Sequence, residues 1–82
     1  MPDFSQAQIL DIWEKAKPIE GKNPKQIRKD KFGKEIAFDA YGLESPKGWN
    51  VHHIVPLEKG GKNDISNLEP LHWKNHKCLH QN

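Results

Sequence analysis

Apolar residues near the beginning of the chain recur at helical spacing and predict an amphipathic helix over residues 5–17. Ser5 is a suitable N-cap, and Pro18 is expected to end the helix because proline lacks a backbone N–H. The predicted apolar face consists of Ile9, Ile12, Trp13 and Ala16, and charged side chains such as Asp11, Glu14 and Lys15 lie on the other side of the helix. We expect this face to pack in the core.

Residues 19–48 lack a sustained period and are expected to form a connecting region. Glycine and proline predict loops at Ile19–Lys25 and Gly42–Gly48. Between these loops, Phe32–Lys34 is typical of a turn and Ile36–Phe38 of a short strand.

The C-terminal part of the chain alternates in places and predicts a second structured unit. Trp49–Val55 is expected to be a strand that ends before Pro56, and Gly60-Gly61 lies in the loop that follows. Residues 67–71 are expected to form no more than a strand fragment. A helix is predicted from Leu71 to about Leu79.

A chain of 82 residues with 34% hydrophobic residues has room for one domain and a small core. A single cysteine, Cys78, rules out an internal disulfide, so a bound metal is the expected additional support. No apolar run approaches the roughly 18 residues of a membrane-spanning helix. The first residues lack the features of a secretory signal, and we expect a cytoplasmic protein with no membrane contact.

The net charge of +2 hides a basic cluster in the connecting region. We expect this cluster to contact nucleic-acid phosphates, and a solvated loop is the alternative interpretation. Its members are Lys22, Lys25, Arg28, Lys29, Lys31 and Lys34.

All five histidines follow residue 51, and histidine both binds metals and acts as a base near neutral pH. His72 and His76 are four residues apart, a spacing that lets two rings on one helix face share an ion. His52 and His53 are neighbours on a predicted strand and should point to opposite faces. The alternative interpretation is an incidental surface pair for His72 and His76, and one packed and one solvated ring for His52 and His53. His80 is either a spare ligand or a frayed terminal residue.

The order and spacing of these groups closely resemble the HNH endonucleases, whose shared core is the ββα-metal finger, and the nuclease domains of the DNase colicins. The match runs from Trp49 to about Lys77 and contains Val51-His52-His53-Ile54-Val55-Pro56, Gly60-Gly61, Asn67-Leu68 and Leu71-His72-Trp73-Lys74-Asn75-His76. The resemblance implies a small α+β single domain over residues 1–82. An N-terminal helix (5–17) and the basic connecting region (19–48) would precede a ββα-metal motif (49–79).

The resemblance also implies a role for each matching residue. His53 corresponds to the general base, and Asn67 to the asparagine that ties the loop back and holds the base in orientation. His52, His72 and His76 correspond to metal ligands. The chain departs from many family members because it lacks two C-x-x-C pairs for a structural zinc, and because those members have Asp and Asn at positions 52 and 76.

One divalent ion is the implied cofactor. Three neutral imidazoles favour Zn²⁺ or Ni²⁺ in the site, with Mg²⁺ or Mn²⁺ as the alternative for activity. The implied substrate is DNA, expected to be double-stranded, with Lys74 and Lys77 as further phosphate contacts. We expect a monomer or small homo-oligomer that works with a phage or bacterial DNA-processing partner.

Three hypotheses follow from these residues. The first is a metal-dependent endonuclease, because a neutral imidazole can take a proton from water and a metal can stabilise phosphate and leaving oxygen. The second is a non-catalytic nucleic-acid-binding module in which the metal only supports the fold. The third is a protein-interaction domain with a vestigial site.

Overall fold

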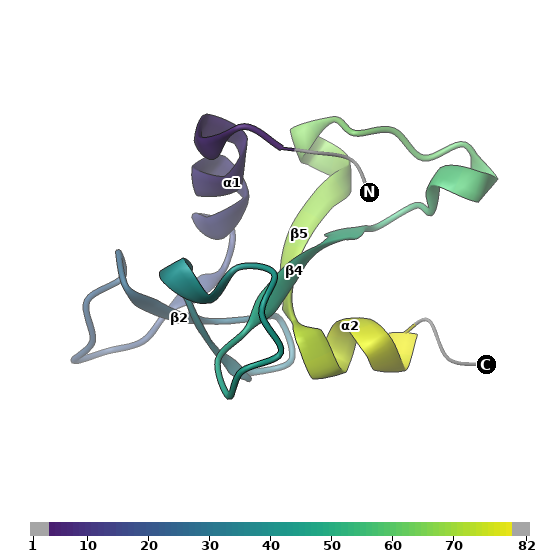
Figure 1. Ribbon diagram of the computed structural model, residues 1–82. Helices are drawn as coiled ribbons and strands as arrows, with labels where there is room; N and C mark the ends of the chain where they lie inside the picture. The colour runs from purple at the N-terminus through teal and green to yellow at the C-terminus, as the bar shows by residue number, and fades with distance from the viewer. Residues whose placement is uncertain (1–3, 80–82) are drawn as a thin grey trace.

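Two helices and two small antiparallel sheets make up residues 4–79, the part of the chain that the computed structural model describes (Figure 1). This arrangement confirms an α+β fold with an N-terminal helix. The helices and strands are α1 (Gln6–Trp13), β1 (Lys17–Pro18), β2 (Ile27–Lys29), β3 (Glu35–Ala37), β4 (Trp49–His53), β5 (Leu68–His72) and α2 (Trp73–Leu79). Short 3₁₀ turns lie at Phe38–Ala40, Leu57–Lys59 and Ile65–Asn67.

Helix α1 begins where the sequence predicts and ends earlier. Ser5 and Gln8 form a capping box, in which each side chain accepts a hydrogen bond from the other residue's backbone N–H. The prediction that the helix reaches residue 17 is wrong, because Lys17 and Pro18 pair with β2 as strand β1. The Arg28 side chain donates hydrogen bonds to the carbonyls of Glu14 and Ala16, directly after the end of the helix.

The core lies between α1 and the sheets. Its buried apolar members are Ile12, Trp13, Ala16, Ile36, Trp49 and Leu68. The ring of Trp13 lies 5.5 Å from that of Phe38 and 5.4 Å from that of Trp49, so aromatic contacts join α1 to β4. Lys15, just after α1, donates hydrogen bonds to the carbonyls of Ile65 and Leu68 and fixes the start of β5.

Strands β4 and β5 form a two-stranded ladder in which Trp49 pairs with His72 and His53 with Leu68. Helix α2 follows β5 directly and packs against both strands, which gives a ββα arrangement (Figure 1). The prediction that residues 67–71 form only a fragment is wrong, since β5 is a full partner of β4. Pro70 is tolerated because each strand of a two-stranded sheet has an open edge.

Helices α1 and α2 have 8 and 7 residues, and within residues 4–79 no helix has the length and apolar character needed to cross a bilayer.

Candidate active site

The loop between β4 and β5 is tied to its own end by Asn67. The Asn67 carboxamide accepts a hydrogen bond from the Val55 N–H at 2.8 Å and donates to the carbonyls of Val55 at 3.1 Å and Lys62 at 2.8 Å. Its backbone carbonyl also accepts from the Ile54 N–H at 2.8 Å. These four bonds fix the backbone directly after His53.

Two glycines let this loop turn sharply. Gly60 has a φ of 89°, which side-chain-bearing residues rarely adopt. At Gly61, an added Cβ would lie 1.7 Å from the Val55 carbonyl oxygen, so only glycine fits beside that backbone. The chain can therefore fold back and bring Asn63 to the end of β4.

His53 is half-buried at the end of β4, and its ring contacts the loop. The His53 Nε2 lies 2.6 Å from the Asn63 Oδ1, and the ring of Phe4 is centred 6.4 Å from the imidazole. Asn67 was predicted to tie the loop back and hold the base. Its side chain bonds the loop backbone. The residue whose side chain contacts the His53 ring is Asn63. Sequence reasoning missed Asn63, whose only signal is a polar side chain two residues after the paired glycines.

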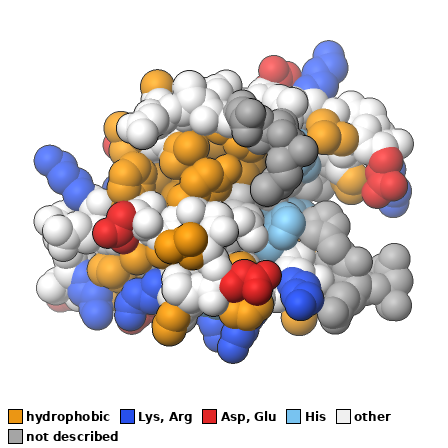
Figure 2. Space-filling model, viewed as in Figure 1, with side chains coloured by type: hydrophobic (Ala, Val, Ile, Leu, Met, Phe, Trp, Pro, Cys, Tyr) orange, Lys and Arg blue, Asp and Glu red, His pale blue; other side chains and the backbone are white. Residues whose placement is uncertain are grey.

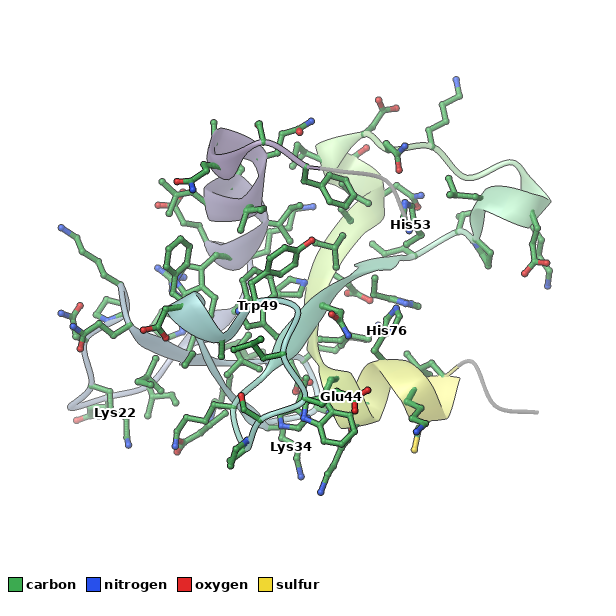
Figure 3. All side chains as sticks on the ribbon, in the orientation of Figure 1. Lys22, Lys34, Glu44, Trp49, His53 and His76 are labelled. Carbon is green, nitrogen blue, oxygen red and sulfur yellow. The ribbon has the colours of Figure 1, made fainter. Side chains whose placement is uncertain are left out.

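His52 and His76 come together from β4 and α2. Their ring centroids are 5.6 Å apart and the rings are nearly perpendicular, at 81°. The Glu69 carboxylate lies 3.9 Å from the His52 Nε2 and forms an ion pair with Lys31 at 2.8 Å. Figure 3 shows His53 and His76 on the side of the molecule away from Lys22.

Within residues 4–79, no three His, Cys, Asp or Glu side chains are grouped closely enough to hold a metal ion. The His52–His76 pair nevertheless fits two ligand positions. When two imidazoles share a tetrahedral ion, metal–nitrogen bonds of about 2.0–2.1 Å put the ring centres roughly 5–6 Å apart, which agrees with the separation of 5.6 Å. His80 follows His76 by four residues and lies outside the described residues.

His72 is not placed with this pair. It is the last residue of β5, so the prediction that it shares a helix face with His76 is wrong. Its ring is almost completely buried, with Nε2 at 2.9 Å from the Pro46 carbonyl and Nδ1 accepting from the Lys74 N–H at 3.1 Å. Because backbone groups occupy both ring nitrogens, His72 has a structural role here and we remove it from the ligand set.

A buried carboxylate lies beside His72. Asp30, which is fully buried, accepts hydrogen bonds from the backbone N–H groups of Phe32, Lys34 and His72, each at 3.0 Å, and from the Asn75 side chain at 2.8 Å. Four donors compensate for burying the charge. Asp30 thereby joins the β2–β3 turn to the start of the helix that carries His76.

The predicted basic cluster does not form a single free patch. Arg28 donates to three backbone carbonyls, those of Glu14, Ala16 and Pro24, so its guanidinium supports the fold. Lys22 lies 3.8 Å from Glu35, at the far end of the molecule from His53 (Figure 3). Figure 2 shows basic side chains distributed over the visible face among apolar and acidic ones.

The remaining predicted phosphate contacts differ in exposure. Lys25, Lys34, Lys74 and Lys77 are exposed, and Lys29 is half-buried in β2. Lys74 and Lys77 are on α2, the helix of His76, and the Lys74 ammonium lies 5.5 Å from the centre of the Trp73 ring. These two lysines are therefore the members of the predicted set that share an element with the candidate site.

Comparison with known proteins assigns the chain to a family. A family model described as HNH endonuclease matches residues 34–82, more than half of the chain. The comparisons with curated proteins and with solved structures gave no match. The matched region contains β3, β4, β5 and α2, including the loop tied by Asn67 and the adjacent histidines. The chain therefore belongs to the HNH endonuclease family.

Proposed function

We propose that the protein is a metal-dependent endonuclease that hydrolyses DNA phosphodiester bonds with His53 as the general base. Membership of the HNH family supports nuclease activity in general. The observation that carries the finer proposal is that the adjacent residues His52 and His53 have different surroundings. His52 packs against His76, with ring centroids 5.6 Å apart, while the next residue, His53, is half-buried at the mouth of a braced loop.

The chemistry assigns each side chain a task. In its neutral form the His53 ring takes a proton from a water molecule, and the resulting hydroxide attacks phosphorus. The phosphorus–oxygen bond to the 3′ oxygen breaks, and this oxygen leaves with the electron pair and is protonated by solvent. His52 and His76 would hold a divalent ion, which would supply electrostatic stabilisation for the phosphate and the leaving oxygen.

The exposed surface near the site favours backbone contacts over base recognition. Lys74 and Lys77 are exposed on the same helix as His76 and are proposed to bind phosphates on either side of the scissile bond. A domain of 82 residues has few side chains left to contact base edges. We therefore propose low intrinsic sequence specificity on a double-stranded DNA substrate, with sequence preference supplied by a DNA-processing partner.

The test is a plasmid-nicking assay with purified protein and Zn²⁺, Ni²⁺, Mn²⁺ or Mg²⁺ in turn, between roughly pH 6 and 9, a range that spans the titration of an ordinary histidine. We expect His53→Ala to reduce cleavage by about 10²–10⁴-fold while metal binding and thermal stability are retained. Ile54→Ala, which removes the next and half-exposed side chain, is the matched control and should cut normally. If the protein nicked the plasmid with none of the four metals, the proposal would be refuted.

A non-catalytic nucleic-acid-binding module is the alternative, and the same assay separates the two. That module would bind DNA without cutting it, and His53→Ala would leave its binding unchanged. The buried Asp30 network argues against a fold that depends on metal, since it provides a cross-link made only of protein groups.

A further inference from the structure

We propose that Asn63 is a positioning residue that fixes the orientation and tautomer of His53, so that Nδ1 is the atom that accepts the proton from water. This inference rests on the proposed function for its catalytic consequence. The contact itself is a separate claim about the folded protein and can be tested without any cleavage.

The atom assignment follows from the chemistry of the contact. The Asn63 Oδ1 lies 2.6 Å from the His53 Nε2, and a carboxamide oxygen can only accept a hydrogen bond. The Nε2 atom must therefore carry the hydrogen. A neutral imidazole has one N–H and one lone pair, so the lone pair lies on Nδ1.

Asn63 is itself held on both sides. The carbonyl of the preceding residue, Lys62, accepts from the Asn67 side chain at 2.8 Å. The carbonyl of the following residue, Asp64, accepts from the Asn67 backbone N–H at 2.8 Å. The backbone on either side of Asn63 is thus tied to Asn67, although its own side chain is at the surface.

These contacts link Asn67 through Asn63 to the ring of His53. Asn67 fixes the loop, the loop presents the Asn63 oxygen, and this oxygen orients the imidazole. When water loses a proton, its O–H bond breaks and Nδ1 gains the hydrogen, while Nε2–H continues to donate to Asn63. The ring can therefore take up the proton without turning, which is the advantage of a base held in place.

The test observes the tautomer directly. Long-range ¹⁵N–¹H correlation spectra of the metal-free full chain, recorded at roughly pH 8 where an ordinary imidazole is neutral, should show His53 with hydrogen on Nε2. Asn63→Ala should give a mixture of tautomers. Asn63→Asp retains an acceptor oxygen and should restore the Nε2–H form. Ser66→Ala, an exposed change in the same loop, is the control and should match the wild type.

Cleavage kinetics then test the catalytic consequence. Asn63→Ala should lower kcat by about 10–100-fold, the range for loss of a partner that orients a histidine, with KM unchanged. A mixed tautomer in the wild type, or an Nε2–H tautomer that persists in Asn63→Ala, would overturn the inference. A fixed tautomer in a protein that does not cut any DNA would support the Asn63 contact and refute the nuclease proposal instead.

Discussion

His72 and His53 occupy opposite ends of the same β-ladder and have opposite surroundings. His72 pairs with Trp49 at one end, is 1% exposed, and has backbone partners at both ring nitrogens. His53 pairs with Leu68 at the other end, is half-buried, and meets an asparagine side chain through one nitrogen. The same side chain therefore serves as a rigid connector at one end and as a candidate reactive group at the other.

The difference shows that the partners of a ring decide its role more than its place in a motif. A histidine whose two nitrogens are both committed to backbone groups can neither bind a metal nor exchange a proton without breaking those bonds. A ring with one committed nitrogen is oriented and still has a lone pair for chemistry. Four experiments test this difference between the two ends of the ladder.

The largest expected effect is on stability at the His72 end. Asp30→Ala removes the acceptor of four hydrogen bonds in a fully buried position and should lower the free energy of unfolding by about 3–5 kcal/mol. Urea denaturation followed by circular dichroism measures the change. Asp39→Ala, at an exposed carboxylate, is the matched control. A loss below about 1 kcal/mol, the net value of one ordinary hydrogen bond, would refute the idea that Asp30 cross-links the fold.

Substitutions of His72 and His76 should have opposite effects on stability and on metal binding. His72→Ala should cost about 2–4 kcal/mol of stability, because it leaves a cavity and unpaired backbone groups, without changing metal affinity of the folded protein. His76→Ala should instead weaken metal binding in calorimetry and leave metal-free stability nearly unchanged. If His72→Ala abolished binding in protein that is still folded, His72 would belong to the metal site after all.

Metal removal should have a moderate effect. A ligand at 100 times its Kd stabilises a folded protein by about 2.7 kcal/mol, so chelation should lower the melting temperature of the metal-loaded protein. The far-UV circular dichroism spectrum at room temperature should not change, because the Asp30 network remains. Unfolding on addition of a chelator would instead favour the metal-supported binding module.

The smallest effect is expected from substitutions of single surface lysines. Lys77→Ala should reduce the slope of log binding constant against log salt by about 0.9, the value for one lost phosphate contact on duplex DNA. Lys22→Ala should leave the slope unchanged, since Lys22 lies near Glu35 at the opposite end from the site (Figure 3). Equal reductions in the two variants would show that DNA also covers the β1–β2–β3 sheet.

Local patterns predicted much of the fold. Ser5 marks the start of α1, and the spacing of Ile12 and Trp13 predicts the buried face. The strand predicted at Trp49–Val55 is present as β4, which ends two residues earlier, at His53. Each of these features depends on neighbours within a few residues. The HNH family was also evident from the sequence, because the motif gathers most of its defining residues in one segment.

The errors concern contacts between distant residues. Arg28 was expected to bind phosphate, and two of its three carbonyl partners are 12 and 14 residues away. His72 was expected on a helix, and the ladder with β4 keeps it in a strand while Asp30, 42 residues earlier, binds its N–H. Asn63 meets His53 only because the loop closes. Periodicity carries no information about such pairs.

The family model begins at residue 34, whereas several groups that brace the matched region lie before it. Asp30 anchors α2, and Lys15 holds the carbonyls on both sides of Asn67. A fragment restricted to residues 34–82 would lack these anchors. The segment that matches the family model therefore depends on contacts from outside it, and we expect a transplant into another scaffold to fold only if the preceding helix and hairpin are included.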